Sequence, residues 1–129
     1  MSTSTALGTL LWTESVCPDG ETDIPADHYT ASPALIARLE SDWDAFTDRL
    51  PDDFEPENAW RGMSPEPSWD AWDQLAHDWI LTRNRHGAGF WDGGWIEPFG
   101  DHLTNLAHQS GELNVILCDS EIHPYGEAI

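Results

Sequence analysis

The sequence contains no lysine, and its 5 basic residues are all arginines set against 24 aspartates and glutamates. The formal net charge is therefore -19 over 129 residues. A protein that binds nucleic-acid phosphates directly needs a cluster of cations on its surface. Anionic membranes repel a strongly acidic protein for the same electrostatic reason. This charge excludes direct binding to nucleic acid and to membrane surfaces from the predicted functions.

Long apolar runs and paired cysteines are missing as well. No run reaches the roughly 18 apolar residues of a transmembrane helix, and residues 1–5 lack the basic region of a signal peptide. Cys17 and Cys118 are far apart and form no Cys-x-x-Cys pair. We expect two reduced thiols in a cytoplasmic protein, with a single disulfide as the alternative in an oxidising compartment.

The hydrophobic content predicts a folded chain. Hydrophobic residues make up 40% of the sequence and include 8 tryptophans, which separates it from disordered chains of similar charge. The length fits one domain, residues 1–129. We predict an α+β fold in which residues 1–78 form a mainly helical acidic half and residues 79–129 form a hairpin, a helix and a second hairpin (ββαββ).

The clearest predicted element is a helix over residues 33–50. Ser32 is a suitable N-cap and Pro33 fits the first helical position. Apolar side chains recur at helical spacing up to Pro51, which ends the run. The other predictions for this half are a short helix or strand at 4–13, a loop at 17–29, an exposed connection at 51–67 tied to the core by Trp60 and Met63, and a helix at 68–78 capped by Ser68.

The second half changes period and is predicted to contain an antiparallel sheet. Residues 79–84 and 90–92 are predicted as strands of a hairpin, with Gly87 and Gly89 supplying the positive backbone angles of its turn. A helix follows at 99–110 with Gly111 at its C-terminal cap. Alternating apolar residues from 113 to 117 indicate a strand, and a turn at 119–120 allows residues 121–125 to pair with it.

The segment from His77 to Asp92 (HDWILTRNRHGAGFWD) resembles a motif of small acidic proteins of phages and other mobile elements. The similarity extends through the helix and strands of residues 100–125 and, more loosely, through the first half. Arg85 stands where the related turns carry glycine, and Trp79-Ile80 replaces a Phe-Trp order. The resemblance implies a mobile-element origin and brings no established activity with it.

The predicted hairpin holds four polar residues, Arg83, Asn84, His86 and Asp92. In a functional interpretation, His86 acts as an acid or base that Asp92 orients. In a structural interpretation, Asn84 bonds the backbone of the turn, and Arg83 pairs with Asp92 across the strands. We favour the structural interpretation.

Acidic residues are dense between positions 40 and 57. Like charges at this density destabilise the compact state, so their retention suggests a function. Carboxylates spaced along a helix can imitate DNA phosphates and occupy the basic groove of a nuclease, a repressor or a CRISPR effector. The candidate partner-binding residues are Glu40, Asp42, Asp44, Asp48, Asp52, Asp53, Glu55 and Glu57.

Catalytic and metal-binding signatures are weak. His102 and His108 are six residues apart, so they share no helix face suited to a metal. The sequence has no Gly-x-Ser-x-Gly motif and no phosphate-binding loop. We therefore expect no catalytic residue, no metal and no cofactor.

The leading hypothesis is a non-enzymatic phage or mobile-element protein that inhibits a host nucleic-acid-binding or defence protein by DNA mimicry. One alternative is an interaction module that uses the hairpin tip, with charge serving solubility or salt adaptation. The other is a small metal-dependent enzyme built on His77, His86, Asp92 and His102. The oligomeric state and the identity of the partner stay open.

Overall fold

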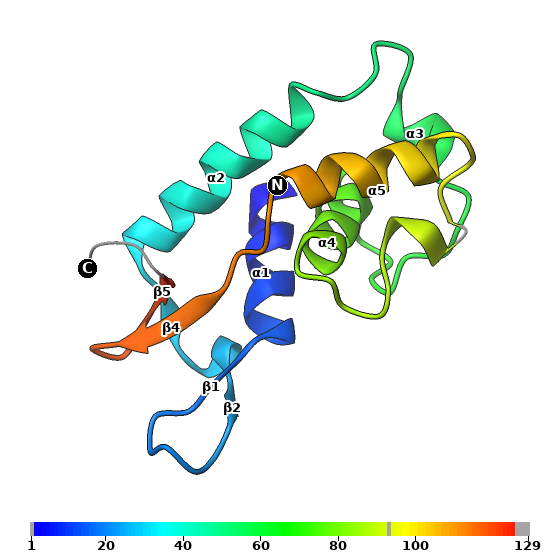
Figure 1. Ribbon diagram of the computed structural model, residues 1–129. Helices are drawn as coiled ribbons and strands as arrows, with labels where there is room; N and C mark the ends of the chain where they lie inside the picture. Colours follow the sequence, from blue (N-terminus) through cyan, green and yellow to red (C-terminus); the bar gives the residue numbers. More distant parts are fainter. Residues whose placement is uncertain (1, 93, 126–129) are drawn as a thin grey trace.

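The computed structural model describes residues 2–92 and 94–125 and has an α+β fold, as predicted (Figure 1). Helices dominate the N-terminal part, and the longest strands lie at the C-terminal end. The elements in chain order are α1 (Ser2–Thr13), β1 (Ser15–Val16), β2 (Ile24–Pro25), η1 (Ala26–His28), β3 (Thr30–Ala31), α2 (Pro33–Thr47), α3 (Pro56–Ala59), α4 (Ala71–Arg83), η2 (Phe90–Asp92), α5 (Phe99–Gln109), β4 (Val115–Cys118) and β5 (Glu121–Pro124). Among these described elements, no helix is long and apolar enough to cross a membrane.

Helix α2 confirms the predicted start. The Ser32 hydroxyl accepts a hydrogen bond from the Leu35 backbone N–H at 3.0 Å, and Pro33 occupies the first turn. The helix ends at Thr47, slightly before the predicted boundary, and a turn covers the residues up to Pro51. Its inward face buries Leu35, Leu39, Trp43 and Phe46, so the opposite face is left to polar residues.

Helix α4 is the centre of the molecule, and its extent corrects the predicted helix at 68–78 and strand at 79–84. Asp70, rather than Ser68, caps it through a reciprocal pair of hydrogen bonds with Asp73. Every residue from Asp78 to Arg83 is buried. A helix enclosed on all sides has no polar stripe, and a short apolar run then resembles a strand in sequence.

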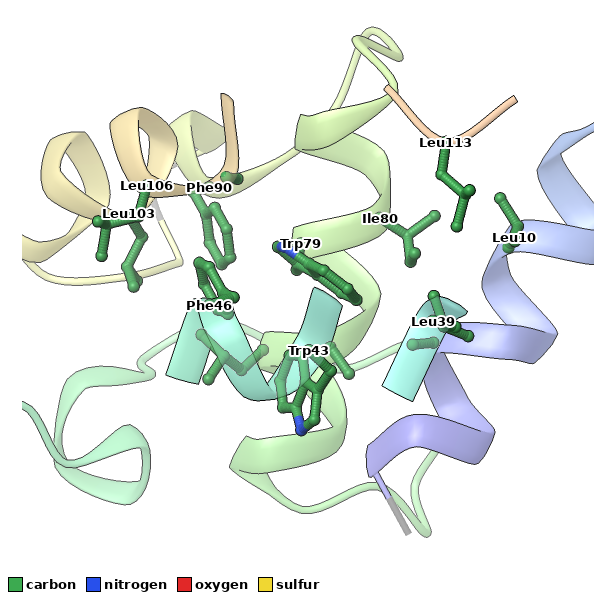
Figure 2. Packing of buried hydrophobic residues seen from close by; sticks show 14 of the residues in the cluster. Leu10, Leu39, Trp43, Phe46, Trp79, Ile80, Phe90, Leu103, Leu106 and Leu113 are labelled. Carbon is green, nitrogen blue, oxygen red and sulfur yellow. The ribbon is translucent and has the colours of Figure 1, made fainter. Parts of the chain in front are cut away.

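Aromatic rings pack around this central helix (Figure 2). Trp79 of α4 lies 5.2 Å from Trp43 and 5.6 Å from Phe46 between ring centroids. Phe90 of η2 stacks on the other side of Phe46 at 6.2 Å. The same cluster takes Leu10 from α1, Leu103 and Leu106 from α5, and Leu113 before β4.

The predicted hairpin at 79–92 is wrong. After α4 the chain makes a tight turn in which the Arg85 N–H bonds the Thr82 carbonyl and the His86 N–H bonds the Leu81 carbonyl. Residues 90–92 then form the 3₁₀ turn η2. The positive φ of 58° falls on Arg85, and neither Gly87 nor Gly89 has one. Gly89 is needed for a different reason, since a Cβ there would collide with the Thr82 hydroxyl and the Trp91 ring.

The C-terminal hairpin of the main sheet was predicted correctly, but the third strand of the sheet is not the predicted one. Strands β4 and β5 pair antiparallel around Asp119 and Ser120, both at positive φ, and Gly111 ends α5 with φ 75°. Strand β3 adds on the far side of β5 in parallel, giving the order β3-β5-β4. The predicted sheet strands at 79–95 are absent from this sheet. Strands β1 and β2 form a separate two-stranded pair, in which β2 lies within the loop predicted at 17–29 and β1 directly precedes it.

The connection at 51–67 is only partly irregular, because it contains α3 and buries Phe54 and Ala59. Trp60 does hold it to the core, with its ring centroid 5.0 Å from that of Trp95. Met63 does not, since its side chain is 94% exposed.

Arg83 joins three helices from a buried position at the end of α4. Its side chain is 1% exposed and donates to the Asp42 carboxylate of α2 at 2.9 Å. It also donates to the Ser110 and Gly111 carbonyls at the end of α5, at 3.0 and 2.7 Å. Its guanidinium lies 4.8 Å from the centroid of the Trp79 ring. These contacts exclude the predicted Arg83–Asp92 pair and satisfy helix-end carbonyls that would otherwise lack donors.

Replacing Arg83 with alanine should destabilise the protein by about 3–5 kcal/mol, because it leaves the two carbonyls without their donor and removes one of the two arginines that pair with Asp42. Urea unfolding followed by tryptophan fluorescence measures the change. Arg49→Ala removes an exposed arginine from the turn after α2 and should cost less than about 0.5 kcal/mol. Equal effects of the two substitutions would contradict a structural role for Arg83.

Arg85→Gly should raise the free energy of unfolding by up to about 1 kcal/mol, because glycine adopts positive φ without a steric penalty. The variant loses only the exposed contact between Arg85 and Glu112 at 4.0 Å, which contributes little. Arg85→Ala loses the same contact and keeps the unfavourable backbone angle. Urea unfolding should therefore give a higher free energy of unfolding for Arg85→Gly than for Arg85→Ala. Equal free energies would contradict backbone strain at position 85.

Candidate functional site

Three carboxylates form a row on the exposed face of α2. Glu40, Asp44 and Asp48 follow one another at four-residue intervals from the body of the helix to its C-terminal cap, and all three are exposed. Four-residue steps along an α-helix place successive side chains about 6 Å apart on one face. The row is held rigidly because the opposite face of α2 lies in the aromatic core.

The row continues beyond the helix into the segment that leads to α3. Asp52, Asp53 and Glu55 are exposed there, Glu57 is exposed in the first turn of α3, and Figure 1 shows the segment running on from the end of α2. Glu55 accepts a hydrogen bond from the Asn58 side chain at 2.6 Å. In the described part of the chain, no salt bridge involves the other six carboxylates, Glu40, Asp44, Asp48, Asp52, Asp53 and Glu57. We call these six residues the acidic row.

Asp42 differs from its neighbours on α2. Its side chain is 21% exposed and lies 3.0 Å from Arg38 and 2.9 Å from Arg83. A carboxylate that holds a buried guanidinium is already neutralised inside the protein. Asp42 therefore has a structural role, and we leave it out of the acidic row.

The structure does not bring the four polar residues of the 83–92 motif together. Asn84 pairs with the Leu113 backbone in both directions, accepting at 2.7 Å and donating at 3.1 Å. His86 lies 3.1 Å from Glu14, which follows α1. Asp92 accepts from the Gly89 N–H at 2.9 Å. With Arg83 in the core, each residue makes a separate structural contact, and the hairpin tip predicted as a binding element does not exist.

A buried carboxyl group that the sequence reasoning missed lies on α4. Asp78 is 6% exposed and accepts hydrogen bonds from the Gln74 amide at 3.1 Å and the Trp95 indole at 2.7 Å. Burial raises the pKa of Asp78 to about 6, the two hydrogen bonds oppose the shift, and the charge of Asp92 adds to it. The only signal in the sequence is an aspartate within a continuous run of core residues.

Asp78 lies at the wall of an open cleft of about 400 Å³. Its lining residues include Trp60, Gln74, His77 and Asp92. His77 and Asp92, two of the four residues proposed for a metal-dependent enzyme, therefore share one cleft, whereas His86 and His102 are not part of its lining. Within residues 2–92 and 94–125, no group of three His, Cys, Asp or Glu side chains is arranged to hold a metal ion.

The remaining histidines and the cysteines contribute no further cluster. His28 and His123 each lie 3.9 Å from a neighbouring acidic side chain. Cys17 and Cys118 are both free thiols, as predicted. Comparison with protein-family models, with curated proteins and with solved structures found no match.

Asp78→Asn should stabilise the protein by on the order of 3 kcal/mol at pH 7 and have little effect below pH 4. The pKa of Asp78 in the folded protein is raised above the ordinary 3.8. The stability that comes from the neutral carboxyl group is therefore fully present below pH 3.8 and is lost as the pH rises through about 6. Asparagine keeps the neutral form at every pH, and the Gln74 amide can rotate to match it.

Urea unfolding of both proteins from pH 4 to 8 measures this difference. Asp23→Asn, which removes one charge from an exposed loop, is the control for net charge. A stability gain for Asp78→Asn that does not grow with pH, or that Asp23→Asn reproduces, would argue against a neutral buried carboxyl group.

Proposed function

We propose that this protein is a non-enzymatic inhibitor that occupies the basic groove of a host nucleic-acid-binding or defence protein by imitating DNA. The observation that carries the proposal is the acidic row, six exposed carboxylates on α2, the segment after it and the first turn of α3, with no salt bridge to any described residue. Surface carboxylates without internal partners are available to arginines and lysines of another protein.

The spacing of the row supports an electrostatic rather than an atom-by-atom mimicry. One strand of DNA carries a charge about every 3.4 Å along the helix axis, whereas the α2 carboxylates are about 6 Å apart. The carboxylates after Thr47 extend the run of negative charge beyond the helix. Because α2 is fixed by its buried face, little conformational entropy is lost when a partner binds.

Two further features support this function. The net charge of -19 steers association with a cationic partner over distances of about the Debye length. The resemblance of residues 77–92 to small acidic proteins of phages and mobile elements fits the same role, because such elements encode inhibitors of host defence. On this basis we place the protein in the cytoplasm of a host cell.

Affinity capture from host lysate at low and high salt, with identification by mass spectrometry, provides candidate partners. The decisive measurement uses each purified partner with a fluorescent DNA duplex. We expect the protein to displace the duplex at low salt and to lose this ability at high salt. Salt screens the attraction between its carboxylates and the cations of the partner, and it reduces the gain from counterion release.

Neutralising five of the six carboxylates of the acidic row should remove the inhibition without unfolding the protein. The variant carries Glu40→Gln, Asp44→Asn, Asp48→Asn, Asp52→Asn and Asp53→Asn. Five exposed pairs of about 0.5 kcal/mol each predict a loss of affinity of roughly 100-fold.

The matched control removes five exposed charges elsewhere, through Glu21→Gln, Asp23→Asn, Asp27→Asn, Asp101→Asn and Glu112→Gln. It has the same net charge and should keep most of the affinity. If both variants lose affinity equally, the effect is one of net charge. If neither loses it, or if no partner exchanges with DNA, the charge serves solubility or salt adaptation.

A further inference from the structure

A second cleft, of about 590 Å³, lies between α1, the segment at 65–69 and α4. Two indole rings, Trp12 and Trp69, line it, and Trp12 is 65% exposed. The cleft contains none of the acidic row and has no part in the proposed function. Its size falls in the range of clefts that hold small organic ligands.

His77 lines this cleft as well as the 400 Å³ cleft beside Asp78, and its neighbours favour one protonation state of its ring. The Thr9 hydroxyl donates its one proton to the Thr5 carbonyl at 2.9 Å. The oxygen of the Thr9 hydroxyl also lies 2.9 Å from His77 Nδ1. Because the hydroxyl has a single proton, which it directs to Thr5, this geometry favours the tautomer in which Nδ1 carries the hydrogen. Burial lowers the pKa of His77, which favours the neutral ring. Nε2 therefore has a lone pair, and no described residue bonds to it.

The other walls define what the cleft can accept. The Trp69 ring packs against His77 at 4.9 Å between centroids, so one flat aromatic wall adjoins the acceptor. Glu66 adds a carboxylate to the lining. Gly8 of α1 leaves the space open, because a Cβ at this position would meet no atom within 4 Å. Indole faces attract cations, and Glu66 and the net charge of the protein repel anions.

We propose that this cleft binds a small planar organic cation of the amidinium or guanidinium type. Its flat face would lie on the rings of Trp12 and Trp69, one N–H would donate to His77 Nε2, and Glu66 would balance its charge. This site is independent of the acidic row.

Benzamidine is the probe for this proposal, and benzoate, of the same shape and opposite charge, is its matched control. We expect benzamidine to shift the indole N–H signals of Trp12 and Trp69 in ¹H–¹⁵N spectra, saturating in the millimolar range. Benzoate should bind at least about 10-fold more weakly. Equal binding of the two compounds, or no saturable shift, would overturn the proposal.

Gly8→Leu should fill the cleft and weaken benzamidine binding by at least about 10-fold. Leucine is a better helix former than glycine, so the variant should remain at least as stable as the parent in urea. Ala37→Leu adds similar bulk at an exposed position of α2 and should bind benzamidine normally. Unchanged binding to Gly8→Leu would contradict the assignment of the site.

The imidazole ¹⁵N signals of His77 report the remaining contact. The parent protein should show Nδ1 protonated and Nε2 unprotonated near pH 7, and benzamidine should shift Nε2. Thr9→Val removes the oxygen that selects this tautomer and should yield a mixture of tautomers. A protonated Nε2 in the parent protein would refute the proposal. Concentration-dependent self-association through Trp12 that benzamidine does not relieve would refute it as well.

Discussion

The buried guanidinium of Arg83 is the constraint on which the packing of this protein depends. A permanent positive charge at 1% exposure is tolerated only where hydrogen-bond acceptors surround it. Three of them come from other helices: the Asp42 carboxylate of α2 and the Ser110 and Gly111 carbonyls at the end of α5. Since the contacts have short, fixed distances, α4 can be buried only if α2 and α5 approach it at these points. The aromatic cluster of Trp43, Phe46 and Trp79 then fills the space around the ion pair.

This constraint divides α2 into two functional faces. Asp42 and Asp44 are the same residue type two positions apart, and the helical spacing of the sequence already places Asp42 at the flank of the polar face that carries Asp44. Arg83, 41 residues away, recruits Asp42 and leaves Asp44 in solvent, because side chains two positions apart point in different directions on a helix. A row of like charges strains the helix that carries it. Here the buried ion pair and the aromatic contacts on the inner face anchor that helix, so the outer carboxylates can stay without internal partners.

Sequence patterns correctly predicted the elements that have one apolar and one polar face. They gave a wrong prediction for α4, where the buried part of the helix has no polar face. Helices α2 and α5 alternate apolar and polar residues with helical period, and the β4–β5 hairpin alternates with period two, so each was recognised. The last turns of helix α4, from Asp78 to Arg83, are buried all round, and the run from Trp79 to Thr82 resembles a strand. That error created a hairpin and, with it, a false proximity of Arg83 and Asp92. The buried Asp78 and the cleft around His77 were missed because they depend on which segments meet in space.

The acidic row and the His77 cleft rest on opposite electrostatic principles. The row gains from being exposed, since its carboxylates act over distance and are weakened by salt. The cleft gains from partial burial, since desolvation strengthens a hydrogen bond to Nε2 and the attraction of a cation to an indole face. The two surfaces meet near the start of α1, where Ser4 lines both the cleft and a smaller groove that reaches Glu40.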